Sequence, residues 1–382
     1  MISLIYLDNS ATTRPFPEVV QVHAEVASRY FANPASLHGL GEESERLLLS
    51  ARRQVASLLG AEAAEIVFTS GGTESNQLAI LGRIRARAHR GKHIITSAVE
   101  HASVRQLMRS LEEQGFEVTW LSPDRAGRIT VEQVIDAVRD DTILVSLIHV
   151  QNELGTIMPV KEIASALRHF PQLVFHVDHV QGAGKECLQM DETPIDLLSI
   201  SAHKLHGLKG TGVLYCREGT SLTTVQDGGG QERGLRSGTV NVAGAVAAAK
   251  AWRLTVERYR QKHTELRKMT ANLRRQLTDI DEVIVLSPED AVSHIVQFAV
   301  PHVKSEVLVN ALSRRNIYVS TQSACASKAH QPSRVLLSCG HSNEVAGSAL
   351  RISLSCETKP AELHEFVGVF KEEVNQLQKV MR

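Results

Sequence analysis

A lysine at the end of an apolar, strand-like run is well placed for covalent chemistry. Lys204 closes the stretch SISAHK (199–204), and glycines follow at positions 207, 210 and 212. Small neighbours at a strand end allow the amine to lie desolvated beside a ligand, where it becomes a useful Schiff-base nucleophile. The alternative is an ordinary surface lysine, since most lysines are exposed.

Two other strand ends carry groups that suit a charged ligand. The stretch TSGGTE (69–74) leads from a strand into a helix, so its glycines and free N–H groups favour a phosphate. Asp178 ends the run FHVD, where a carboxylate needs a positive partner such as a protonated pyridine nitrogen, an Arg or a helix N-terminus. A plain strand-to-helix turn and a structural ion pair are the alternatives for these two features.

A glycine-rich stretch, residues 228–239, contains Arg233 and Arg236 and ends at Thr239. It lacks Pro and long Ser runs, which indicates a rigid anion-contacting loop rather than a linker. The phosphate loop, strand-end Asp178 and strand-end Lys204 follow one another in the order expected of a pyridoxal 5'-phosphate site with an acidic partner for the ring nitrogen. The combination is far more specific than any one of its members.

The elements that must position these residues alternate between strands and helices. Short strands are expected at 66–68, 93–96, 117–121, 142–149, 174–178, 197–201 and 212–216, and helices at 54–59, 74–87, 104–114 and 163–169. This alternation predicts an α/β fold with a mainly parallel sheet sandwiched by helices. Ligands of such folds bind at the carboxyl ends of the strands, where the residues above are expected to lie.

The pattern changes after about residue 240. A long helix is expected from Ala243 to about Leu277, followed by strands near 283–286 and 294–300 and by a final amphipathic helix. We therefore expect a large cofactor-binding domain at 14–256 and a smaller α+β domain formed by 1–13 and 257–382. The boundary then falls inside the long helix.

Composition argues against several classes of function. The 382 residues include 42 Lys plus Arg and 42 Asp plus Glu, so no overall field favours nucleic acid or an anionic membrane, and the basic run from Arg83 to Lys92 is expected to be a solvated helix end. Five cysteines without a C-x-x-C pair argue against a disulfide framework and a metal site. With no apolar run of membrane-spanning length and no signal-like start, a cytoplasmic protein is expected.

The chain also resembles a cysteine desulfurase of the NifS/IscS type, within the class-V aminotransferase superfamily of fold-type-I pyridoxal-phosphate enzymes. The motifs that carry this resemblance occur in family order over nearly the whole chain. They are YLDNSATT (6–13), NPASLH (33–38), FTSGGTESN (68–76), EH (100–101), NELGT (152–156), DHVQ (178–181), SAHK (201–204), the stretch 228–239, SAC (323–325) and RIS (351–353).

The resemblance implies a role for each matching residue. Lys204 holds pyridoxal phosphate and later moves protons at the substrate α-carbon, Asp178 pairs with the pyridinium nitrogen, and Gln181 hydrogen-bonds the ring hydroxyl. His101 stacks on the ring and takes part in proton transfer. The remaining implied residues are Gly72, Thr73, Ser201, His203 and Asn152 for the cofactor, Thr239 of the other subunit for the phosphate, and Arg351, Asn9 and Asn152 for the substrate carboxylate.

Cys325 is the implied nucleophile, which attacks the substrate sulfur, keeps it as a persulfide and leaves alanine as the product. Its surroundings are polar and rich in small residues, so the thiol is expected to be exposed, and Lys328 favours the thiolate. Gln322 departs from the family pattern, in which a glycine is commoner before Ser-Ala-Cys, and this change bears on the flexibility of the loop and on turnover. The other cysteines, at 187, 216, 339 and 356, are expected to be small or incidental hydrophobes.

The implied partners are L-cysteine, a second copy of the chain in a homodimer, and protein sulfur acceptors that serve iron–sulfur clusters or tRNA and cofactor thiolation. A loop as long as Ser320 to about Ser333 suits direct transfer to such an acceptor. An aminotransferase on the same scaffold would not need Cys325, and a selenocysteine lyase would differ mainly in rejecting sulfur. An inactive scaffold subunit would not need Lys204, Asp178 and His101 together.

Overall fold

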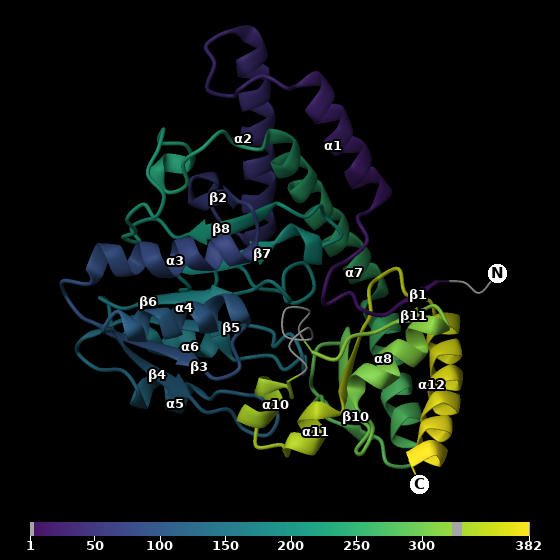
Figure 1. The fold of residues 1–382 in the computed structure, drawn as a ribbon. Coiled ribbons are helices and arrows are strands. Elements are labelled where there is room, and N and C mark those ends of the chain that lie inside the picture. Colours follow the sequence, from purple (N-terminus) through teal and green to yellow (C-terminus); the bar gives the residue numbers. More distant parts are fainter. Residues whose placement is uncertain (1–3, 323–330, 382) are drawn as a thin grey trace.

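The computed structural model describes residues 4–322 and 331–381. In this part of the chain the central element is a seven-stranded sheet in the order β2-β8-β7-β6-β5-β3-β4 (Figure 1). Its strands are β2 (Ile66–Thr69), β3 (His93–Ser97), β4 (Glu117–Leu121), β5 (Thr142–Ile148), β6 (Val174–Asp178), β7 (Leu197–Ser201) and β8 (Gly212–Cys216). These bounds confirm the expected strands to within one residue at each end.

The sheet is mainly parallel, as expected. β8 runs antiparallel to both of its neighbours, β2 and β7, and the other pairs are parallel. A short connection between β7 and β8 allows the antiparallel pairing, whereas parallel neighbours need a longer crossover. The carboxyl ends of β2, β6 and β7 therefore meet at the same edge of the sheet.

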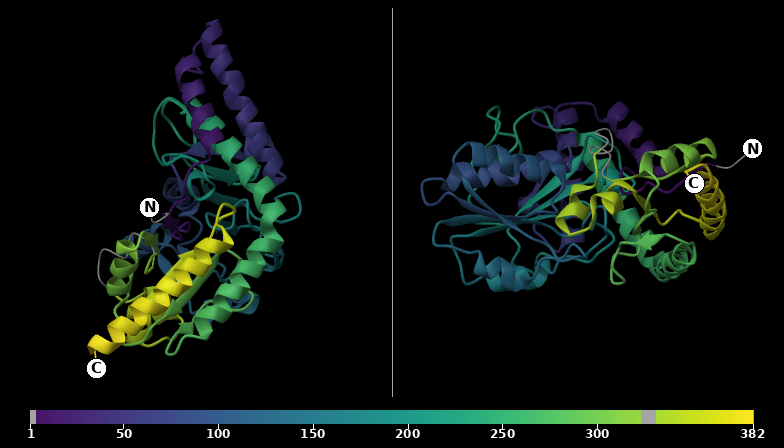
Figure 2. Two further views of the ribbon diagram at one scale, coloured as in Figure 1. Left: turned by 90° about the vertical axis from the view of Figure 1, so that its right-hand side faces the viewer. Right: turned by 60° about the horizontal axis from the view of Figure 1, so that its bottom comes forward.

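Helices cover both faces of this sheet (Figure 2). One face packs against α3 (Gly72–Arg87) and α4 (Ala102–Glu113), and the other against α2 (Gly39–Leu59), α5 (Val131–Asp136), α6 (Val160–Leu167) and the first part of α7 (Val242–Thr278). Successive side chains of one strand point to opposite faces, so Val174 of β6 belongs to the α3/α4 core and Phe175 to the other. The observed layers confirm the expected α/β fold.

The C-terminal half has its own core around two small sheets. An antiparallel sheet is formed by β9 (Ile284–Val285), β10 (Ile295–Ala299) and β12 (Ala349–Ser353) in the order β12-β10-β9, and β1 (Ile5–Tyr6) pairs in parallel with β11 (Ile317–Tyr318). α8 (Ser305–Arg314) and α12 (Pro360–Met381) pack on this core, whereas α10 (Arg334–Ser338) and α11 (Asn343–Gly347) pack against the core of the large sheet. β1, near the start of the described chain, is thus held by the C-terminal half, where α12 also lies (Figure 1).

The two cores meet along α1 (Pro17–Arg29) and α7, the long helix that connects the two halves (Figure 1). Trp252 packs in the core of the large sheet, while Tyr259 and Leu273 pack in the core of the C-terminal half. The division into 14–256 and 1–13 plus 257–382 stays a prediction, because α7 contributes side chains to both cores without interruption.

The basic run at the end of α3 is not wholly solvated, so the expectation from sequence is wrong for its first member. Arg83 is only 3% exposed. Its Nε donates to the Ile143 carbonyl at 3.1 Å, and its Nη2 donates to the Gln172 carbonyl. These bonds connect α3 to β5 and to the segment before β6. They also compensate the cost of burying the Arg83 guanidinium between α3 and the sheet.

Among the described residues, no helix has the length and apolar character that a membrane span requires.

Candidate active site

The carboxyl ends of β2, β6 and β7 open on one cavity of about 200 Å³. Residues from β12 and from the segment after β1 close it, so both halves of the chain contribute. Of the residues singled out in the sequence, the cavity brings together Gly72, Thr73, His101, Asn152, Asp178, Gln181, Ser201, His203, Lys204 and Arg351. Their grouping makes a shared site possible, and their individual roles stay predictions.

The N-terminus of α3 forms the wall beside β7. A Cβ added at Gly72 would lie 2.7 Å from Val180 Cγ2, so only glycine allows this close approach. The first N–H groups of a helix lack intrahelical partners and favour an anion. Glu74, in the first turn of the helix, is paired with Arg236 at 3.1 Å. Burial opposes its ionisation, but the Ser70 N–H and Arg236 outweigh burial and lower the Glu74 pKa.

Asp178 projects from the end of β6 and is 3% exposed. Its Oδ2 accepts a hydrogen bond of 2.8 Å from the Asn76 side chain, and its Oδ1 accepts one of 3.1 Å from the Val180 N–H. The second hydrogen of the Asn76 amide goes to Ser103 Oγ at 2.9 Å. Two neutral donors orient the carboxylate without cancelling its charge, which suits it to a cationic group of a ligand.

His101 precedes α4 as its N-cap and is linked to Asp178 through the same network. Its Nδ1 lies 2.9 Å from Ser103 Oγ and accepts from the Ser103 N–H at 3.2 Å. Because Nδ1 accepts, the proton of the neutral ring lies on Nε2. Burial lowers the pKa of His101, with Lys204 and Arg351 adding to the effect and Asp178 opposing it. The imidazole is therefore neutral near pH 7 and able to accept a proton.

Lys204 ends a short 3-10 turn, Ala202–Lys204, directly after β7. Its Nζ donates to the carbonyls of Ser10 and Ala11, at 2.7 Å for Ala11. Burial lowers the Lys204 pKa to about 7, and the positive charges of Arg351 and Lys185 add to this shift. The same surroundings lower the pKa of the neighbouring His203 to about 4, through burial first and Lys204 second.

Arg351 lies on β12 with only 1% of its surface exposed. Its Nη2 pairs with Asp8 Oδ1 at 3.0 Å and its Nη1 donates to the Asn152 carbonyl at 2.7 Å. Burial raises the pKa of Asp8 despite the neighbouring Arg351. A guanidinium fixed in this way presents a rigid fork that matches a carboxylate.

Two of the expected site residues that the structure describes, Asn9 and Thr239, do not line the cavity. Asn9 is buried beside it, but its amide donates to the carbonyls of Ser353 at 2.9 Å and Tyr6 at 3.3 Å. Thr239 is exposed and does not line the cavity. Cys325 lies outside the described residues.

The other cysteines differ in exposure. Cys216, Cys339 and Cys356 are buried and Cys187 is exposed. Burial raises the pKa of Cys216 and Cys356 to about 11 and that of Cys339 to about 12, so none of these three is a thiolate near neutral pH.

Ser10, Asn76 and Ser103 also line the cavity, although the sequence predicts no role for them. Asn76 follows Gly72 by four residues on α3, so the two share a helix face, and this spacing is the signal that identifies Asn76 once Gly72 is placed at the cavity. Ser10 has no comparable signal, because it reaches the cavity through a contact with Lys204, far along the chain.

In the ranges 4–322 and 331–381, no three His, Cys, Asp or Glu side chains lie close enough together to hold a metal ion.

Known proteins resemble this chain in sequence and in fold. A model of the family described as "Aminotransferase class-V" matches residues 5–366. A protein of Lactobacillus delbrueckii subsp. bulgaricus named "NifS/IcsS protein homolog" is 42% identical over 380 residues, which are 99% of each chain. A "Cysteine desulfurase IscS" of Methanosarcina thermophila is 39% identical over 98% of this chain and 93% of its own.

The same likeness extends to solved structures. One named "NIFS-LIKE PROTEIN" superposes with a TM-score of 0.92 at 33% identity, over 98% of this chain and all of its own. Family match, sequence identity and fold agree over nearly the full length, so this chain belongs to the class-V aminotransferase family and, within it, to the NifS/IscS type.

Proposed function

We propose that this chain is a cytoplasmic, pyridoxal-phosphate-dependent cysteine desulfurase. It removes sulfur from L-cysteine, releases L-alanine and keeps the sulfur as a persulfide on Cys325 for transfer to protein acceptors. A relative that is 39% identical over nearly the whole chain carries the name of this activity, which supports the proposal.

The observation that carries the proposal is the chemistry gathered in one cavity. The carboxylate of Asp178, the low-pKa amine of Lys204 and the buried guanidinium of Arg351 come from three separate elements and line the same space. A guanidinium suits the carboxylate of an amino acid, and an amine that is partly neutral near pH 7 reacts with an aldehyde. Together these groups fit an aldehyde cofactor that acts on an amino-acid substrate.

Unpartnered polar atoms support the fit of pyridoxal phosphate. Ser10 Oγ, Asn76 Oδ1, Gln181 Oε1 and Arg351 Nε are buried and have no hydrogen-bond partner among the described residues, and all four residues line the cavity. Buried polar groups are normally hydrogen-bonded. A ligand with a ring hydroxyl, a ring nitrogen, a phosphate and an adjacent carboxylate offers partners for such atoms.

When bound, pyridoxal phosphate supplies a sink for the electron pair left at the substrate α-carbon. Asp178, oriented by Asn76 and Val180, faces the ring nitrogen in our assignment, and Gln181 faces the ring hydroxyl. The phosphate is bound by Gly72 and Thr73 at the start of α3, by Ser201 and His203, and by Thr239 of a second copy of the chain, while Asn152 completes the cofactor set.

Lys204 and His101 handle protons in this proposal. The neutral amine of Lys204 accepts the proton of the substrate α-carbon and later returns a proton. His101, whose pKa burial lowers, is a second proton acceptor on the same cavity wall. Arg351 holds the substrate carboxylate, with Asn9 and Asn152 beside it.

Cys325 accepts the sulfur. Its thiolate forms a bond to the sulfur of cysteine as the carbon–sulfur bond breaks, and the electron pair of that bond stays with the carbon fragment. Protons then convert this fragment to alanine, so one cysteine and one thiol give one alanine and one persulfide. A protein acceptor, serving iron–sulfur cluster assembly or tRNA or cofactor thiolation, takes the terminal sulfur without direct binding of nucleic acid.

The variant Cys325→Ala tests this function. We expect it to bind pyridoxal phosphate and to change its absorbance with cysteine, yet to make almost no alanine, because a methyl group cannot attack sulfur. Wild-type protein treated with cysteine should gain one sulfur at Cys325 by mass spectrometry, removable by thiol exchange.

Continued alanine production by Cys325→Ala would contradict the proposal. A wild-type protein that moved amino groups to a keto acid would favour an aminotransferase, and one that accepted selenocysteine but rejected cysteine would favour a selenocysteine lyase.

A further inference from the structure

Glu232 lies in the glycine-rich stretch 228–239, yet its side chain is only 1% exposed. Its two carboxylate oxygens accept hydrogen bonds of 2.6 and 2.7 Å from the two terminal nitrogens of Arg52, on α2. One of these oxygens also accepts the backbone N–H of Phe68, on β2, at 2.8 Å. A bidentate pair between a carboxylate and a guanidinium holds both partners in one geometry, so the stretch is fixed to α2 and β2 at this point.

The backbone at Glu232 has a conformation that side chains rarely adopt. Glu232 has a φ of 48° and Arg233 a φ of 59°, so two successive residues that are not glycine lie in the left-handed region. Such residues cost conformational energy and persist only where surrounding contacts impose them. The buried pair of Glu232 with Arg52 provides such a contact.

A second ion pair joins the same stretch to the start of α3. Arg236 Nε lies 3.1 Å from Glu74 Oε1, and the Ser70 N–H donates to the other oxygen of Glu74. The stretch is therefore attached to both sides of the turn between β2 and α3.

Thr239 lies exposed between two fixed points of the chain. Before it, the Gly238 N–H donates to Gln231 Oε1 at 2.9 Å. After it, Asn241 caps α7 by accepting the Gly244 N–H at 2.8 Å. The stretch thus presents Thr239 at the surface from a fixed base, although Thr239 does not line the cavity of its own chain.

We propose that Glu232 is a positioning residue for the cofactor site of a second copy of the chain: its pair with Arg52 holds the stretch so that Thr239 meets the phosphate bound there. This inference rests on the proposed homodimer with Thr239 in a composite site. Each cofactor site then depends on an ion pair located in the other subunit. The Arg236–Glu74 pair supports the same stretch less strongly, since both of its side chains are partly exposed.

The first test compares Glu232→Gln and Arg236→Gln with the wild-type protein. Glu232→Gln keeps the size of the side chain and removes its charge. We expect amide exchange in peptides covering 228–239 of the cofactor-free protein, and the Kd for pyridoxal phosphate, each to rise about tenfold, the factor expected for loss of one charge-assisted hydrogen bond. Arg236→Gln, a milder change, should raise both by about threefold.

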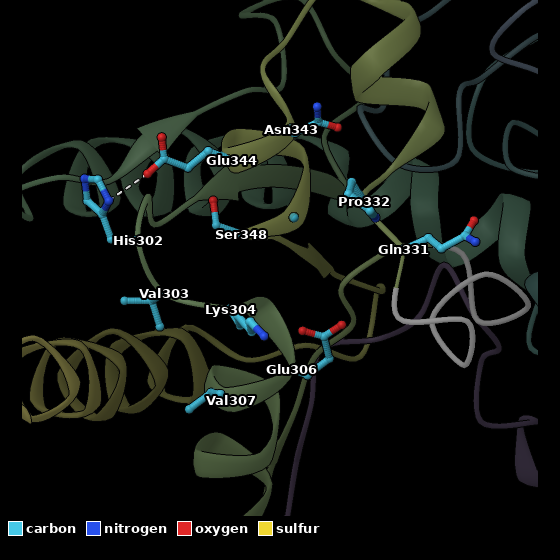
Figure 3. A pocket seen from close by; sticks show the side chains of 11 residues that line it. His302, Val303, Lys304, Glu306, Val307, Gln331, Pro332, Asn343, Glu344 and Ser348 are labelled. Carbon is cyan, nitrogen blue, oxygen red and sulfur yellow. Dashed lines mark ion pairs between the residues drawn. The ribbon is translucent and has the colours of Figure 1, made fainter. Parts of the chain in front are cut away.

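Two matched controls remove a carboxylate from ion pairs that do not touch the stretch. Glu18→Gln breaks the pair with Arg258 at 2.5 Å, which joins α1 to α7. Glu344→Gln breaks the pair with His302 at 2.7 Å, at the wall of a second cavity of about 510 Å³ that residues of α8 and α11 line (Figure 3). Both controls should match the wild type in exchange of 228–239 and in the Kd for pyridoxal phosphate.

Mixed dimers show which subunit the Glu232 pair serves. Lys204→Ala removes the reporting lysine from the subunit that carries it, so cofactor trapped on Lys204 by borohydride comes from the other subunit alone. In the first mixed dimer one subunit carries Lys204→Ala and the other Glu232→Gln, so the reporting site receives an intact stretch. In the second, one subunit carries both changes and the other is wild type, so the reporting site receives the altered stretch. We expect the first dimer to retain pyridoxal phosphate like a dimer with Lys204→Ala alone, and the second to bind it about tenfold more weakly.

Unchanged exchange in both Glu232→Gln and Arg236→Gln would overturn the proposal, as would an equal effect of the controls. The opposite result in the mixed dimers, with weak binding in the first and normal binding in the second, would show that Glu232 acts within its own subunit. The proposed sulfur chemistry fails separately. If Cys325→Ala still makes alanine, the sulfur-accepting role is wrong, while cofactor retention in the mixed dimers still reports on Glu232.

Discussion

The amine of Lys204 should titrate near pH 7 in the cofactor-free protein. Burial lowers its pKa to about 7, with the charges of Arg351 and Lys185 adding to the shift. At pH 7 about half of the Lys204 amines are then neutral, compared with roughly one in 3,000 for an ordinary lysine. The neutral fraction alone accounts for an advantage of about a thousandfold in reaction with an aldehyde.

The contacts of Lys204 favour the neutral form as well. A neutral amine has two N–H bonds and one lone pair, and the structure provides two carbonyl acceptors, from Ser10 and Ala11. Both hydrogens can therefore be satisfied while the lone pair stays available. An ammonium would carry a third donor into surroundings that already hold Arg351 and Lys185.

Reductive methylation with formaldehyde measures this pKa directly. Cofactor-free protein is labelled at a series of values from about pH 5.5 to pH 9, and each lysine is quantified by mass spectrometry against its ordinary pKa near 10.4. Labelling of Lys204 should rise to a plateau with a midpoint near pH 7. In Arg351→Gln the Lys204 midpoint should move up, because a positive neighbour has been removed.

A Lys204 labelling curve that reaches no plateau by pH 9 would refute this reasoning, since burial would then not govern the amine. An unchanged midpoint in Arg351→Gln would show that Arg351 contributes nothing to the lowered pKa of Lys204.

Three further outcomes are expected. Asp178→Asn should bind pyridoxal phosphate but lower turnover at least 100-fold, because the ring nitrogen loses its negative partner. This factor corresponds to an activation barrier higher by on the order of 3 kcal/mol. Stopped-flow and steady-state assays separate binding from turnover. Light scattering should find a homodimer, and Thr239→Ala should weaken cofactor retention, whereas a fully active monomer would rule out a composite site. Burial raises the pKa of Glu100 to about 8, so the folded protein holds this proton more tightly than the unfolded chain does, and its stability falls as pH rises from about 4.5 through 8. Glu100→Gln should show a smaller fall in resistance to urea over this range. An equal fall would mean that Glu100 ionises normally.

The large sheet and its strand-end residues could be predicted because their signals are local. Runs such as Val174–Asp178 are apolar, β-branched and short, so they read as strands before any contact is known. Asp178 and Lys204 could then be placed together, since β6 and β7 are parallel neighbours whose carboxyl ends share one edge. The position of Gly72 at the same cavity follows from the same reasoning.

Contacts between distant segments could not be predicted in this way. The bonds of Lys204 to Ser10 and Ala11 join residues more than 190 positions apart in the sequence, and Asp8 pairs with Arg351, which is 343 positions away. The basic run that begins at Arg83 has the composition of a solvated helix end. The Arg83 guanidinium nevertheless donates hydrogen bonds to carbonyls of two other segments. Periodicity and residue type describe a segment and its faces, and they do not identify which distant carbonyl will lie opposite.

The segment from Asp8 to Thr13 connects the two halves of the site. On one side it is bound to β12, through Ser10 N to Ser353 Oγ at 2.7 Å. On the other side Thr13 Oγ1 donates to the His203 carbonyl at 2.8 Å, beside Lys204. A shift of β12 relative to the large sheet therefore changes the contacts of Lys204 and of Arg351 together, because residues 8–13 contact both side chains. Ser320 also pairs with Arg351 through the backbone, so it follows that shift too.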